Sequence, residues 1–149
     1  MNMPENIPAV DVLTQLFRSK HAVIGVVGLG YVGLPLAIAY SQSGYRVYGV
    51  DCEKAKVEGI LSGKSPITGV HSEDLAFALS NGFTATSSYS CLIKCDAVII
   101  CVPTPLNVDG SPDINSITNA VTSCAPFVKK GQIISLESTT YPGTTSKTV

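Results

Sequence analysis

Charged residues are scarce in this sequence. Only 14% of the 149 residues are charged, against about 25% in a typical domain. So few charges predict that part of the surface is covered by another domain or subunit. The formal net charge of −1 leaves no excess of basic residues. We therefore predict that neither nucleic acid nor a membrane is a partner.

Cysteine and histidine lack the spacing of a metal site or a disulfide framework. The two histidines stand alone, and no C-x-x-C pair occurs among the five cysteines, which are Cys52, Cys91, Cys95, Cys101 and Cys124. We therefore predict no metal site. Buried thiols in a reducing cytoplasm are the simplest explanation of the cysteines.

Features of a secretory leader and of a membrane span are also lacking. The first ten residues carry Glu5 and no Lys or Arg, so they have no basic n-region. Residues 22–43 are free of charge and long enough to cross a membrane. Four glycines and Pro35 divide this segment, however, and a buried strand, a turn and a helix explain it better. We predict a cytoplasmic protein.

Apolar runs and helical segments alternate along the chain. Runs typical of buried parallel strands lie at 22–27, 47–50, 83–85, 97–102 and 132–136. Helical patterns lie at 32–42, 53–61, 72–79 and 112–128, with Ser111-Pro112 as a helix start. The alternation predicts an α/β fold, a Rossmann-type doubly wound parallel sheet in three α/β/α layers.

A glycine-rich turn follows the first predicted strand and opens a helix. Gly28, Gly30 and Gly33 form G-x-G-x-x-G, with Tyr31 and Val32 between the last two. The first glycine permits a tight turn, the second lets a pyrophosphate approach the backbone, and the third lets the helix pack close to the strand. The pyrophosphate then meets N–H groups at the positive end of the helix dipole.

An acidic residue follows the next strand, as a dinucleotide site requires. Asp51 lies 18 residues after Gly33, where its carboxylate can accept both ribose hydroxyls of an adenosine. A carboxylate there repels a 2′-phosphate, so NAD is favoured over NADP, although Lys54 and Lys56 leave the choice open. The alternative is that the glycines serve only packing and Asp51 caps a helix.

Two later strands end in unusual sequences. Ligands of open α/β sheets lie beyond the carboxyl ends of the strands. Pro103-Thr104-Pro105 has restricted φ angles, which would hold the Thr104 hydroxyl over the site. Residues 137–145 form a hydroxyl-rich turn that can donate to a nicotinamide ribose or a substrate. Both segments are also composed of ordinary loop residues.

Four segments together carry a family resemblance. GLGYVGLPLA, VYGVDCEKAKVEGILSGKSPI, DAVIICVPTPLNVDGSPDINSI and ISLESTTYPGTT occur in this order. They resemble the N-terminal NAD-binding domain of the UDP-glucose/GDP-mannose dehydrogenase family, from about residue 21 to residue 145. The similarity is greatest to the UDP-N-acetylhexosamine 6-dehydrogenase branch. We accordingly expect residues 1–20 to form an N-terminal helical extension and residues 21–149 to form the NAD-binding domain.

The resemblance implies an oxidation of the C6 alcohol of a UDP-sugar to the carboxylate. Two NAD molecules would be consumed, through an aldehyde and a cysteine thioester. The implied cofactor-binding residues are Gly28, Gly30, Tyr31, Val32, Gly33, Asp51, Lys56, Val102, Pro103, Thr104 and Thr139. Among them, Asp51 and Lys56 would lie at the adenosine ribose, and Thr104 and Thr139 would face the nicotinamide half.

The resemblance assigns no catalytic residue to this chain. The family's nucleophilic Cys, its Lys and its Asn belong to parts of the protein downstream of residue 149. We expect a longer protein, with a central helix and a C-terminal sugar-nucleotide domain. None of the five cysteines is expected to replace that nucleophile. Similar sequences carry an acidic residue after PGTT, whereas Ser146 and Lys147 stand here, and Glu137 is not assigned its role. We expect the chain alone to be inactive and the longer protein to form a homo-oligomer.

Three other functions remain open at the level of sequence. A β-hydroxyacid or 6-phosphogluconate-type dehydrogenase would share the glycine turn, but it would need other substrate motifs. A non-catalytic nucleotide-binding module is the second alternative. A purely structural protein is the third, and it would bind no dinucleotide.

Overall fold

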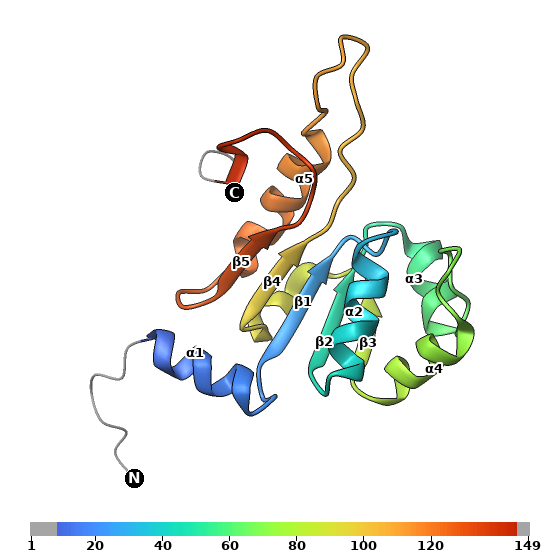
Figure 1. The fold of residues 1–149 in the computed structure, drawn as a ribbon, viewed down its shortest axis with the longest axis vertical. Helices are drawn as coiled ribbons and strands as arrows, with labels where there is room; N and C mark the ends of the chain where they lie inside the picture. The colour runs from blue at the N-terminus through green and yellow to red at the C-terminus, as the bar shows by residue number, and fades with distance from the viewer. Residues whose placement is uncertain (1–8, 146–149) are drawn as a thin grey trace.

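A parallel sheet forms the centre of the computed structural model, which describes residues 9–145 (Figure 1). Its five strands run in the order β3-β2-β1-β4-β5. Their bounds are β1 Val23–Val27, β2 Arg46–Val50, β3 Phe83–Thr86, β4 Ala97–Ile100 and β5 Ile133–Leu136. The chain builds outward from β1 to β3 and then crosses to β4, so the strand order reverses between β1 and β4.

The strand register aligns the three loops that lie at this reversal. Val27 at the end of β1 is paired with Val50 at the end of β2 and with Ile100 at the end of β4. The segments that follow β1, β2 and β4 therefore begin side by side at one edge of the sheet. A crevice at this switch point is the expected ligand position in such a fold.

Helices cover both faces of the sheet. On one face, α2 (Gly33–Gln42), α3 (Lys54–Leu61) and α4 (Ser72–Ser80) bury Leu34, Ile38, Ile60 and Leu75 against the strands. On the other face lie the 3-10 helix η1 (Tyr89–Lys94) and α5 (Asn115–Cys124), which bury Leu92 and Ala120 against β4. The doubly wound, three-layer α/β/α fold predicted from the sequence is confirmed.

The helix α1 (Ala9–Arg18) lies beside the edge of the sheet where the strands begin (Figure 1). The Tyr45 hydroxyl donates to the carbonyl of Phe17 at 2.9 Å, and Lys20 Nζ lies 3.1 Å from the same hydroxyl. Phe17 packs against the core, whereas Val10 is 70% exposed. The helix therefore packs against the core near its C-terminal end, whereas Val10 near its start is exposed.

The predicted start of the last helix at Pro112 is wrong. Residues 103–114 form a long loop in which Leu106 and Pro112 pair in an isolated antiparallel bridge. The helix begins at Asn115, whose N–H donates to the Asp113 carboxylate at 2.9 Å. It ends at Cys124, where the short 3-10 helix η2 (Ala125–Phe127) follows.

Within residues 9–145, no helix has both the length and the apolar character needed to cross a membrane. The charge-free stretch after residue 21 is divided between β1, the glycine turn and α2, as the sequence predicted. Its hydrophobicity reflects burial in the centre of the sheet.

Candidate functional site

The fold itself requires two glycines of the turn. Gly28 has a φ of +93°, and a Cβ at this position would lie 2.7 Å from the Cys101 carbonyl oxygen. A Cβ at Gly33 would overlap the Gly28 carbonyl oxygen. These two glycines have a packing role, because they let the start of α2 and the segment that follows β4 approach the turn closely.

Gly30 has no such packing role. A Cβ built on Gly30 would meet no atom within 4 Å, so the folded chain leaves open space over this residue. The N-terminus of α2 faces the same turn, and its N-cap residue, Val32, provides no side-chain cap. N–H groups of a first helical turn have no acceptor within the helix. An open backbone beside an uncapped helix N-terminus fits a pyrophosphate.

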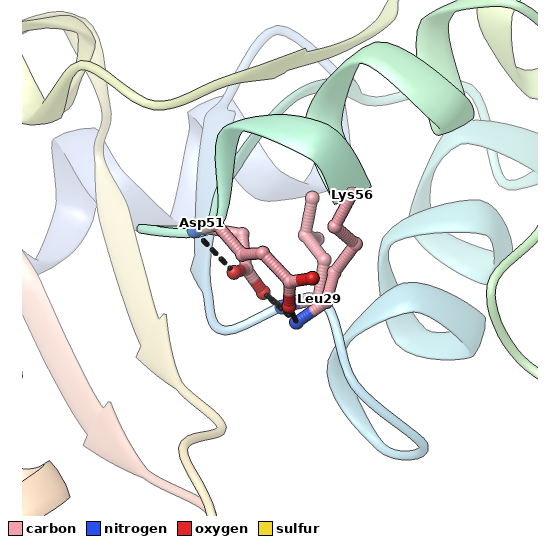
Figure 2. A network of polar contacts seen from close by, with 4 residues as sticks. Leu29, Asp51 and Lys56 are labelled. Atoms are coloured by element: carbon pink, nitrogen blue, oxygen red, sulfur yellow. Dashed lines mark hydrogen bonds and ion pairs between the residues drawn. The ribbon is translucent and has the colours of Figure 1, made fainter.

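Asp51 links the end of β2 to the glycine turn (Figure 2). Its Oδ2 accepts from the Leu29 N–H at 2.8 Å and from Lys56 Nζ at 2.9 Å, while Oδ1 accepts from the Glu53 N–H at 3.0 Å. Burial alone would raise the pKa of Asp51. The hydrogen bond from Lys56 and the two backbone donors outweigh burial, so the pKa is lowered.

Lys56 comes from the first turns of α3 and completes this contact (Figure 2). Burial would lower the pKa of Lys56, but the hydrogen bond and the charge of Asp51, with a smaller contribution from Glu53, raise it. The amine is therefore a cation at neutral pH. Asp51 and Lys56, which the sequence placed together at the adenosine ribose, do meet in one ion pair.

Two clefts open at this edge of the sheet. The first, which we call the α2-side cleft, includes Tyr31 and Val32 before α2 and has a volume of about 650 Å³. The second, the α5-side cleft, includes Ser116 and Asn119 of α5 and has a volume of about 460 Å³. Six residues line both clefts: Gly28, Asp51, Glu53, Lys56, Val102 and Pro103. The buried carboxylate of Asp51 therefore stands in a wall that the two clefts share.

The α2-side cleft gathers ten of the eleven predicted cofactor residues. They are Gly28, Gly30, Tyr31, Val32, Asp51, Lys56, Val102, Pro103, Thr104 and Thr139. The eleventh residue, Gly33, lies in the first turn of α2 and does not line the cleft. Residues that follow four different strands thus converge on one space, although they are distant in the sequence.

Two short hydrogen bonds fix the far wall of the α2-side cleft. The Thr104 hydroxyl donates to the Thr139 carbonyl at 2.6 Å, and the Ser138 hydroxyl donates to the Val102 carbonyl at 2.6 Å. Both bonds join the loop after β4 to the loop after β5. The Thr104 hydroxyl is therefore committed to protein, and this role was not predicted from the sequence.

The α5-side cleft contains residues that the sequence analysis missed. Cys52 and Tyr89 line it together with Ser116, Asn119 and Ser123 of α5. The spacing of the three α5 residues places them on one helical face, a polar stripe that could have been read from the sequence. Burial raises the pKa of Tyr89, whose position on η1 had no sequence signal.

Further residues of the α2-side cleft were also missed as site residues. They are Glu53, Pro66, Ile67 and Cys101, while Glu137 and Ser138 belong to the hydroxyl-rich turn that was predicted to donate to a ligand. Glu137 is exposed and accepts from the Ser135 hydroxyl at 2.6 Å. Ser146 and Lys147, where the sequence lacks an acidic residue, lie outside the described residues.

The expectation of five buried thiols is wrong for two cysteines, since Cys52 is exposed and Cys91 is half-buried. Burial raises the pKa of Cys95 to about 12 and the pKa values of Cys101 and Cys124 to about 11. These three thiols are therefore protonated at neutral pH and are poor nucleophiles. Residues 9–145 contain no cluster of three His, Cys, Asp or Glu side chains that could hold a metal ion.

Residues 22–149 match the family model described as the UDP-glucose/GDP-mannose dehydrogenase family, NAD binding domain. The chain belongs to this family. Its cofactor is accordingly NAD, and the geometry of the glycine turn and Asp51 fits that ligand. The helix α1 precedes the matched residues.

Named relatives cluster around one branch of this family. A UDP-N-acetyl-D-mannosamine dehydrogenase of Escherichia coli K12 is 39% identical over 130 residues, covering 85% of this chain and 30% of the relative. A UDP-N-acetyl-D-glucosamine 6-dehydrogenase of Pseudomonas aeruginosa is 35% identical, with 86% of this chain and 30% of the relative covered.

Solved structures of dehydrogenases share this fold. The UDP-D-ManNAc dehydrogenase of Pyrococcus horikoshii aligns with a TM-score of 0.80 at 38% identity, covering 85% of this chain and 30% of that protein. The chain therefore spans about a third of the length of these relatives.

Proposed function

We propose that this chain binds NAD across the two clefts and is the cofactor-binding part of a UDP-N-acetylhexosamine 6-dehydrogenase. The observation that carries the proposal is the position of Asp51, which is buried, charged and bonded to the glycine turn. The names of the relatives support the choice of branch.

The residues that line the two clefts support one placement of the dinucleotide. We assign the adenosine to the α5-side cleft, with its ribose at Asp51 and Lys56. The pyrophosphate lies over Gly30 and the N-terminus of α2, where Tyr31 and Val32 border the open space. The nicotinamide half lies in the α2-side cleft, next to the wall formed by Val102, Pro103, Thr104 and Thr139.

The proposed reaction converts the C6 alcohol of the UDP-sugar to the carboxylate of a uronate. This is a four-electron oxidation, so two hydrides leave C6 in succession and one water oxygen is incorporated. NAD, when bound, supplies the hydride acceptor. The residues of this chain bind and orient the dinucleotide, exclude water from its nicotinamide face and place that face toward the sugar.

The remaining proposals concern the whole protein. Residues 21–149 are assigned to the NAD-binding domain and residues 1–20 to a helical extension. The nucleophilic cysteine and the sugar-nucleotide pocket are assigned to a further domain that binds the UDP-sugar. The whole protein is proposed to work in the cytoplasm as a homo-oligomer.

Calorimetric titration of the chain with NAD tests the first step. We expect saturable binding that weakens at least tenfold in Asp51→Asn, roughly the effect of losing one charge-assisted contact. Glu58→Gln provides a matched control, because Glu58 is exposed on α3 and lines neither cleft. Absence of NAD binding by the folded chain would contradict the proposal.

A second assay tests whether the chain alone can catalyse the oxidation. The chain is mixed with NAD and UDP-N-acetylmannosamine or UDP-N-acetylglucosamine, and NADH absorbance is followed. We expect no sustained NADH formation from the chain alone, since no described cysteine is assigned as the nucleophile. Steady turnover would show that the chemistry does not need another domain.

A further inference from the structure

Glu53 completes a three-residue charge cluster at the shared wall. Lys56 Nζ lies 2.9 Å from Asp51 Oδ2 and 3.3 Å from Glu53 Oε2. All three side chains line both clefts. With two carboxylates and one amine, the cluster has a net charge of −1.

Lys56 is the one basic residue among the described residues that line either cleft. Lys54, which the sequence left as a second candidate for a 2′-phosphate, is exposed and lines neither cleft. Any cationic contact to a phosphate on the adenosine ribose would therefore have to come from Lys56. Both of its ion-pair partners compete for that amine.

The side chain of Glu53 has no capping role that would explain its position. Glu53 is the N-cap residue of α3, but its side chain makes no capping hydrogen bond. The side chain is 62% exposed, so it contributes little to packing. Its ion pair with Lys56 is the contact that connects it to the site.

We propose that Glu53 is a specificity residue that excludes NADP by holding Lys56 between two carboxylates. This inference rests on the proposed binding of NAD in these clefts. A 2′-phosphate adds nearly two negative charges beside the cluster, and the net charge of −1 repels it. Without Glu53 the cluster is neutral, and Lys56 has donors free for the phosphate while it keeps its bond to Asp51. NAD carries hydroxyls at the same ribose, so the charge of Glu53 affects it much less.

The test measures dissociation constants of NAD and NADP by calorimetry at low ionic strength. We expect Glu53→Gln to bind NADP about tenfold more tightly than the wild type, the effect of one nearby charge. Its affinity for NAD should change by a smaller factor than its affinity for NADP, so the ratio of the two dissociation constants should move toward NADP. Glu58→Gln, which removes an exposed charge from the same helix, should change neither constant.

A double variant tests whether the effect of Glu53 on NADP binding depends on Lys56. In Glu53→Gln/Lys56→Met the gain in NADP affinity should disappear, because the amine that would bind the phosphate is gone. Persistence of the gain would overturn the role given to Lys56. Glu53→Ser provides a second substitution that suits an N-cap position, and it should reproduce the result of Glu53→Gln.

The outcomes separate this inference from the proposed function. Variants that bind NAD normally but show the wild-type preference against NADP would overturn the role of Glu53 and leave NAD binding intact. A wild-type chain that binds neither dinucleotide would overturn the proposed function and this inference with it. Tighter NADP binding by both Glu53 variants, abolished in the double variant, supports the inference.

Discussion

The Asp51 carboxylate accepts a hydrogen bond from the backbone N–H of Leu29 at 2.8 Å. The acid that ends β2 thereby fixes the glycine turn that follows β1. The same oxygen also receives Lys56, so the ribose-binding acid has a structural role that does not depend on a ligand. Its removal should affect both binding and folding.

The stability of the chain should depend on pH through Asp51. Its folded pKa is lowered, so the stabilisation is present above the unfolded carboxyl pKa of about 3.9 and is lost as pH falls through the folded value. We expect Asp51→Asn to be about 2 kcal/mol less stable than the wild type at neutral pH. The difference should shrink below about pH 4.

Urea unfolding of both proteins across that pH range measures this difference. Asp11→Asn, on the exposed surface of α1, is a suitable control and should change stability little. A constant difference between the wild type and Asp51→Asn at all pH values would contradict the prediction.

Two glycine substitutions should separate packing from ligand binding. Gly33→Ala should destabilise the chain by about 3 kcal/mol, because the new Cβ overlaps the Gly28 carbonyl. Gly30→Ala should change stability by less than about 1 kcal/mol, since nothing lies within 4 Å of the new atom. It should nevertheless weaken NAD binding at least tenfold, because the methyl group occupies the space assigned to the pyrophosphate.

Chemical denaturation and calorimetry of the two variants provide the measurements. Normal NAD affinity in Gly30→Ala would mean that the dinucleotide does not approach this part of the backbone.

The hydrogen bond between Thr104 and Thr139 should affect binding of the nicotinamide half of NAD. Thr104→Val removes a 2.6 Å hydrogen bond between the loops after β4 and β5. We expect this change to lower the free energy of unfolding by about 1 kcal/mol. NAD should bind less tightly, whereas AMP, which fills only the adenosine position, should bind as before. Thr122→Val is the control, because Thr122 is exposed on α5. Equal weakening for AMP and NAD would place Thr104 elsewhere than at the nicotinamide half.

Cys52 should be the first thiol to react with a maleimide at neutral pH. It is exposed and lines the α5-side cleft, whereas burial keeps Cys95, Cys101 and Cys124 protonated. Saturating NAD should slow the labelling, and Cys52→Ser should remove the fast phase. Mass spectrometry of the labelled peptides identifies the site. Fast labelling that NAD leaves unchanged would contradict the placement of the adenosine.

The fold was predictable because its central strands are short, apolar and buried. β1 and β4 lie in the centre of the sheet, so nearly every residue in them is apolar. The start of α5 was not predictable from Ser111-Pro112. A helix start there competes with the bridge between Leu106 and Pro112, which depends on how the whole loop folds back.

The site was predictable where its residues belong to a sequence motif with a known binding role. Gly30 and Asp51 are in such a motif, and the structure places both at the α2-side cleft. Glu53 was missed, and so was the bond from Ser138 to Val102, because both depend on neighbours in space. An exposed Glu at a helix start is common, and only the distance to Lys56 distinguishes this one.

The wall shared by the two clefts has a consequence for how tightly a dinucleotide is held. Once one half of the ligand is bound, the other half is confined beside its own cleft at a high effective concentration. The contributions of the two clefts to the association constant therefore multiply. AMP and nicotinamide mononucleotide added together as separate molecules should occupy the clefts far more weakly than the joined dinucleotide does.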